Sequence, residues 1–71
     1  MQKTFPKLRG RIVEKFGSQS AFAEALKTTD VTVVNKLNGK SSFSLEDIVN
    51  WCNTLDITKD EVGSYFFYDT L

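Results

Sequence analysis

The stretch 18–40, SQSAFAEALKTTDVTVVNKLNGK, constrains the fold most, because it predicts two short helices separated by a tight polar turn. Ser18 can cap a first helix that ends near Leu26, with its apolar residues on one face. Thr29 can cap a second helix over Asp30–Leu37, and the Asn-Gly pair that follows is a typical helix stop. The inward-facing residues of this pair are expected to be Phe22, Ala23, Leu26, Val33 and Leu37.

The same helical periodicity continues on both sides of this stretch. It predicts a helix over 6–16 that ends at Gly17, and a fourth helix from a capping box at Ser44 to about Leu55. A second capping box opens a fifth helix over about 58–66, so the chain is predicted to be one all-α, five-helix domain over residues 1–71. The core is expected to contain Leu8, Ile12, Phe16, Phe22, Leu26, Val33, Leu37, Ile48, Val49 and Cys52. Leu45 and Leu55 are expected on the same apolar stripe of the fourth helix as Ile48, Val49 and Cys52. Phe43 is expected to enter the core from the loop before that helix.

The composition excludes several classes of protein. The 71-residue chain has a single cysteine, Cys52, and no histidine, so neither an internal disulfide nor a Cys/His metal cluster can form. The chain lacks a glycine-rich phosphate loop and is too short to build a deep pocket, so we expect no enzyme activity, cofactor or small-molecule substrate. No apolar run is long enough for a signal peptide or a membrane span, which favours a cytoplasmic protein without membrane contact.

The net charge of zero conceals a gradient along the chain. Residues 1–16 carry five basic side chains and one acidic one, whereas residues 44–71 carry one basic and six acidic ones. DNA-binding proteins usually present a net positive surface, because neutralising phosphates releases counterions and supplies much of the affinity. The charge pattern therefore lowers the odds of DNA binding without excluding it.

The run AFAEALKTTDVTVVNKLNGK and the following FSLEDIVNWCNTLDI resemble the lambda-repressor-like helix-turn-helix family, which includes phage repressors and Cro-type regulators. The opening TFPKLRGRIVEKFG and the ending GSYFF are similar to small Cro-like proteins of temperate phages of Gram-positive hosts. The chain also resembles the small modulator-of-repression, or antirepressor, proteins of lactococcal temperate phages. The resemblance implies a five-helix helix-turn-helix domain that acts with a phage repressor, in the host cytoplasm, in the choice between lysis and lysogeny.

The chain departs from this family on the face that would read DNA. Where members often carry polar base-reading side chains, it has Asp30, Val31 and Val34. Asn35 is the clearest base-reading residue left on that face. Asp30 can stabilise a helix start, typically by about 0.3–1 kcal/mol, or accept a hydrogen bond from cytosine, and in either case it repels phosphate. Lys27 stands where the turn often has glycine, and a positive φ there would cost roughly 1 kcal/mol.

The two outer valines, Val31 and Val34, admit three interpretations. One of them could belong to the core, either could contact a thymine methyl group, or both could form an exposed apolar patch for a protein partner. The patch is the interpretation that we favour, because valine cannot replace a polar base reader.

The basic residues of the first helix also admit more than one role. Lys7, Arg9, Arg11 and Lys15 could contact phosphates, together with Gln19 at the start of the second helix. The same charges could simply be solvated on an amphipathic helix, or they could complement an acidic protein surface.

Two hypotheses about function follow. The first is an antirepressor that docks one helix face onto the DNA-binding domain of a phage repressor and so blocks operator binding. The second is a Cro-type repressor that binds operator DNA through Gln19, Asn35 and the basic N-terminal residues. A joint complex of this chain, the repressor and DNA would combine the two. The partner-binding face of the first hypothesis comprises Asp30, Val31, Val34 and Asn35.

Overall fold

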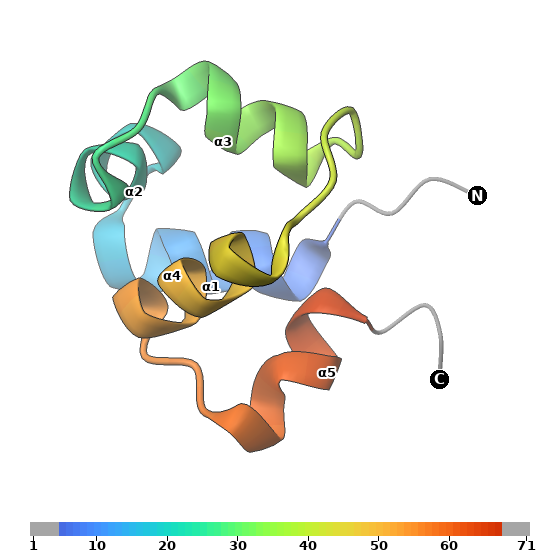
Figure 1. Ribbon diagram of the computed structural model, residues 1–71. Helices are drawn as coiled ribbons and strands as arrows, with labels where there is room; N and C mark the ends of the chain where they lie inside the picture. The colour runs from blue at the N-terminus through green and yellow to red at the C-terminus, as the bar shows by residue number, and fades with distance from the viewer. Residues whose placement is uncertain (1–4, 68–71) are drawn as a thin grey trace.

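The computed structural model describes residues 5–67 of the chain (Figure 1). Within them the chain forms five α-helices and one short 3-10 helix, η1, and it forms no strand. The all-α, five-helix prediction is therefore confirmed. Lys3 and Asp69, which contribute to the charge gradient of the sequence, lie outside the described residues. The elements are α1 (Pro6–Phe16), α2 (Gln19–Leu26), α3 (Asp30–Leu37), α4 (Leu45–Leu55), η1 (Lys59–Glu61) and α5 (Val62–Phe66).

Local capping places the helix starts where the sequence predicts them. The side chains of Ser18 and Thr29 each accept a hydrogen bond from the backbone N–H three residues later, at 3.1 and 3.2 Å. Ser44 forms the predicted capping box at the start of α4. The capping box at Thr58 is also present, but it opens η1, so a 3-10 turn precedes the fifth helix.

Left-handed residues end three of the helices. Gly17 follows α1 with φ 84°, and Lys27 follows α2 with φ 62°. Asp56 does the same after α4, with φ 57°. Lys27 therefore takes the positive φ that a glycine would adopt at little cost, and the chain makes its tight turn between α2 and α3 without glycine.

The helices surround one core (Figure 1). α1 and α4 pack together in the middle of the molecule, with α2 and α3 on one side and α5 on the other. Each helix contributes at least one buried side chain, from Leu8 in α1, Phe22 in α2 and Val33 in α3 to Leu55 in α4 and Phe66 in α5. The other buried residues are Phe5, Ile12, Ala23, Leu37, Trp51, Cys52, Ile57 and Tyr65.

Phe43 fills the core from the loop before α4, as predicted. Its ring makes edge-on contacts with Phe5, Trp51 and Phe66, at centroid distances of 5.3, 4.8 and 5.1 Å. Such T-shaped pairs are typically worth about 0.5–1.5 kcal/mol beyond the area that they bury. Phe43 therefore ties both ends of the described chain to α4.

The core prediction is wrong for Val49, and the predicted apolar stripe of α4 also includes an exposed residue, Leu45. Val49 is 49% exposed and Leu45 is 79% exposed. The buried face of α4 consists of Trp51, Cys52 and Leu55. Because successive helical residues turn by about 100°, a buried face that includes Trp51 is directed away from Val49. Leu45 is the first residue of α4, and its side chain lies outside the core. The predicted core residues Phe16, Leu26 and Ile48 are partly buried and pack against the core.

Candidate functional site

The predicted partner-binding face lies on α3, and its residues differ in exposure. Val33 and Leu37 point into the core and are fully buried, which fixes the rotation of the helix about its axis. Val31 is 66% exposed, whereas Val34 and Asn35 are half-buried. The outward direction predicted for Val31 is therefore confirmed, whereas Val34, also predicted to face outward, is only partly exposed.

Asp30, the first residue of α3, is exposed and hydrogen-bonded to α2. The Ser20 hydroxyl donates to Asp30 Oδ2 at 2.6 Å. A carboxylate in the first turn of a helix also interacts favourably with the helix dipole. Asp30 therefore sits beside Val31 in a defined position. Sequence reasoning did not anticipate its bond to Ser20, which bridges two helices.

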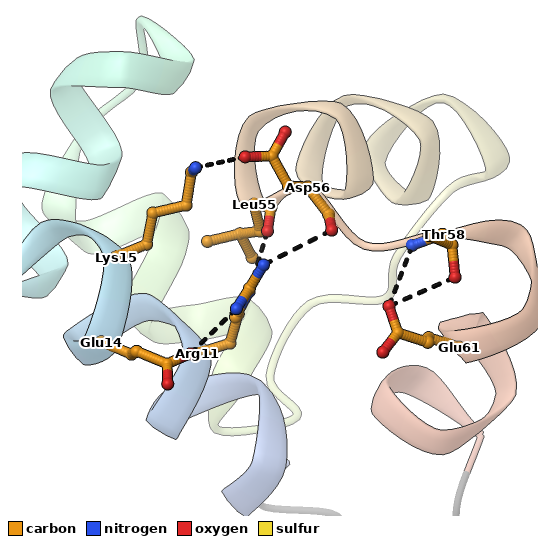
Figure 2. Close-up of polar contacts among 7 residues, drawn as sticks. All are labelled: Arg11, Glu14, Lys15, Leu55, Asp56, Thr58 and Glu61. Atoms are coloured by element: carbon orange, nitrogen blue, oxygen red, sulfur yellow. Dashed lines mark hydrogen bonds and ion pairs between the residues drawn. The ribbon is translucent and has the colours of Figure 1, made fainter.

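Two basic residues of α1, Arg11 and Lys15, bind groups at the C-terminal end of α4 (Figure 2). Arg11 Nε donates to the backbone oxygen of Leu55 at 2.9 Å, and its guanidinium also reaches the oxygen of Asp56 at 3.4 Å. A 2.9 Å bond to Glu14 is the main cause that raises the pKa of Arg11. Lys15 pairs with the Asp56 carboxylate and lowers its pKa. These cations thus hold the C-terminal end of α4.

Arg9 plays the corresponding part at the C-terminal end of α3. Its guanidinium donates to the backbone oxygen of Leu37 at 3.1 Å and to Asn38 Oδ1 at 2.8 Å. Helix ends leave carbonyl groups without intrahelical partners, and an arginine can donate hydrogen bonds to them.

Lys7 is exposed, with its ammonium 4.8 Å from the centre of the Tyr65 ring. Gln19 is half-buried at the first position of α2. The phosphate contacts predicted for these side chains stay a prediction.

A second charged cluster fastens α3 to the start of α4. Lys36 Nζ donates to Asp47 Oδ2 at 2.8 Å and to the backbone oxygen of Ser42 at 3.0 Å. The hydrogen bond from Lys36 is the largest of the causes that lower the pKa of Asp47. Asp47 also accepts from the backbone N–H of Ser44 as part of the capping box. This cluster, which the sequence did not reveal, links α3 to the loop before α4 and to the first turn of α4.

An open groove lies between the loop before α4 and the C-terminal helix, and both Phe5 and Phe67 line it. Cys52 is a buried thiol whose pKa is raised by desolvation. Within residues 5–67 there is no group of three or more His, Cys, Asp and Glu side chains that could hold a metal ion. None of the helices in that range is long and apolar enough to cross a membrane.

Comparison with known proteins places the chain in a family. A family model described as "Protein of unknown function (DUF739)" matches residues 1–69. The chain belongs to this family. Its structure is similar to the solution structure of the modulator of repression (MOR) of the temperate bacteriophage TP901-1 from Lactococcus lactis, with a TM-score of 0.84 and 33% sequence identity. The match covers 94% of this chain and 90% of that one. The search of curated proteins found no match.

Proposed function

We propose that this DUF739 member is a phage regulator that binds a phage repressor and thereby prevents the repressor from binding its operator. It acts by binding and not by catalysis. Similarity to a phage modulator of repression at 33% identity over nearly the whole chain supports the regulatory role. The observation that carries the mode of action is the exposure of Val31, at 66%, on a helix whose other side is fully buried.

The chemistry of the α3 face suits a protein partner better than DNA. Valine offers no hydrogen bond to a base edge, and Asp30 repels phosphate. An apolar centre with a polar rim is the usual make-up of a protein interface, and Val31 with Val34 supplies such a centre between Asp30 and Asn35. The DNA-binding domain of the repressor is the proposed partner, since covering it would block the operator by direct competition.

A set of valine-to-aspartate variants tests this proposal against the repressor encoded in the same genome. Val31→Asp and Val34→Asp should weaken the complex by about 2 kcal/mol or more, because each would bury an unpaired charge at the contact. Val31→Asp should leave the domain folded, since this side chain is mostly exposed. Isothermal titration calorimetry measures the affinity, and circular dichroism melts report folding.

Two controls make the result specific. Val49→Asp changes an exposed valine of α4 that lies about 200° around the helix from Asp47, the residue that holds α3, so it should bind the repressor normally. Val33→Asp places a charge in the core and should unfold the domain. Normal binding by both Val31→Asp and Val34→Asp would show that the face is wrong. Tight binding of operator DNA by the isolated protein would favour the Cro-type function instead.

A further inference from the structure

The Asp30 carboxylate is a fixed negative charge beside the apolar patch. Ser20 Oγ donates to one of its oxygens, Oδ2, at 2.6 Å, which ties the carboxylate to α2. Among the residues that the structure describes, its other oxygen, Oδ1, has no hydrogen bond or ion pair. Asp30 itself is exposed. One oxygen is therefore oriented by the fold, and the other is available to a partner.

The partner named in the proposed function must carry groups that attract such an oxygen. A DNA-binding domain grips phosphates through arginine and lysine side chains and through backbone N–H groups. These donors bind any suitably placed anionic oxygen, and a carboxylate makes short, charge-assisted hydrogen bonds with them. Val31 follows Asp30 directly, so a partner that packs against the apolar patch would also exclude water from the contact of the Asp30 carboxylate. Excluding water lowers the local dielectric constant and strengthens this ionic contact.

We propose that Asp30 acts as a substitute for a DNA phosphate and occupies a phosphate-binding cation of the repressor, with Ser20 as the residue that positions it. This inference rests on the proposed function and adds the chemistry of the contact. It assigns to Ser20, on α2, a part in recognition although its hydroxyl bonds only within the molecule. A substitute for phosphate also explains how an acidic residue, at a position where DNA-binding relatives often carry a base-reading side chain, can favour binding to the repressor.

The test is the salt dependence of affinity for the same repressor. The affinity of Asp30→Asn should fall by about fivefold or more, and its dependence on salt between about 0.05 and 0.3 M should become shallower, because one ionic contact is lost. Ser20→Ala should weaken binding in the same direction by a smaller factor. The double variant should bind no more weakly than Asp30→Asn, since Ser20 acts only through that carboxylate. Circular dichroism melts confirm that each variant is folded.

Asp60→Asn is the matched control. It makes the same chemical change in the exposed residue Asp60 of η1, next to α5 and on the opposite side of the molecule from α3 (Figure 1). It should keep the wild-type affinity and salt dependence. Equal effects of Asp30→Asn and Asp60→Asn would reduce the effect to net charge and overturn the inference.

The remaining outcomes separate the inference from the proposed function. If Val31→Asp disrupts the complex while Asp30→Asn and Ser20→Ala bind with unchanged salt dependence, the face is right and the phosphate substitution is wrong. If the wild-type protein does not bind the repressor, the proposed function fails and the inference fails with it. Weaker binding of Asp30→Asn to operator DNA alone would make Asp30 a base-reading residue and overturn the inference.

Discussion

Between residues 5 and 67, the backbone carries local strain at three residues that are not glycine. Phe5, Lys27 and Asp56 all have positive φ, and each borders a helix. A left-handed conformation typically costs such residues about 1 kcal/mol or more. Burial of the Phe5 ring helps offset the cost at the start of α1, and ion pairing between Asp56 and Lys15 helps at the end of α4.

The glycines of α1 predict opposite responses to the same substitution. Gly10 lies inside the helix, and a Cβ added there would meet no atom within 4 Å. Gly10→Ala should therefore stabilise the protein by about 0.5–1 kcal/mol, because alanine loses less backbone entropy on folding. Gly17→Ala also has open space but sits at φ 84°, so it should destabilise by about 1 kcal/mol. Urea unfolding followed by circular dichroism measures both. A stabilised Gly17→Ala would contradict the left-handed helix end.

Individual residues also show how far sequence reasoning reaches. Caps such as Thr29 and Ser18 depend on neighbours within a few residues, and these predictions are confirmed. The prediction for Val49 is wrong because the apolar stripe of α4 is wider than one helix face, and packing of Trp51 decides which edge is buried. The outward position of Val31 follows from the buried pair on the other side of α3.

At the scale of elements, α1 organises the ends of two other helices. Arg9 bonds the last turn of α3, and Arg11 bonds the last turn of α4. Periodicity marks these arginines only as polar positions of an amphipathic helix. Their acceptors are backbone oxygens 28 and 44 residues away, so neither contact could be predicted from local pattern. The sequence therefore predicted the helices well and the polar bonds between them poorly.

Loss of the Arg11 contacts should destabilise the protein. Arg11→Met keeps the length of the side chain but removes its donors to Leu55 and Asp56, which should cost about 1–2 kcal/mol. Lys40→Met removes the same charge from an exposed residue after α3 and should change stability by less than about 0.5 kcal/mol. Thermal and urea unfolding compare the two variants. Equal stabilities would mean that the contacts at the end of α4 contribute nothing measurable.

At the scale of the whole molecule, acid should weaken the attachment of α3 to α4. Lys36 is the main cause that lowers the pKa of Asp47 below its ordinary value of 3.8. The carboxylate therefore stabilises the fold above that value, and the contribution is lost as the pH falls through the lower pKa of the folded state. Asp47→Asn should be less stable than wild type near neutral pH, by about 1 kcal/mol, and should lose less stability on acidification.

Urea unfolding from about pH 7 to about pH 2 measures this difference. Lys36→Met is the partner control, because it removes the principal cause of the lowered pKa, and it should flatten the pH dependence in part, since the hydrogen bonds from Ser44 still lower the pKa of Asp47. Parallel curves for wild type and both variants would contradict a stabilising role for this ion pair.

The distribution of charge predicts weak binding of DNA by the isolated protein. The net charge is zero, and within α1 the side chains of Arg9, Arg11 and Lys15 are engaged by the fold. At about 0.15 M salt, fluorescence anisotropy with operator DNA should give a Kd no tighter than the about 10⁻⁶–10⁻⁴ M typical of non-specific binding. Nanomolar, sequence-specific binding would contradict this expectation.

The arginine contacts of α1 also have a consequence for synthesis on the ribosome. α1 is translated before the other helices, yet the oxygen atoms that Arg9 and Arg11 bind belong to Leu37 and Leu55. Neither contact can form until those residues have emerged, and the buried rings of Tyr65 and Phe66 emerge later still. Domains generally fold as units, so this one completes its structure only after Tyr65 and Phe66 have emerged. A ribosome that stops before these residues therefore releases a fragment that cannot complete the fold, so the surface that we propose as the repressor-binding face would not form on it.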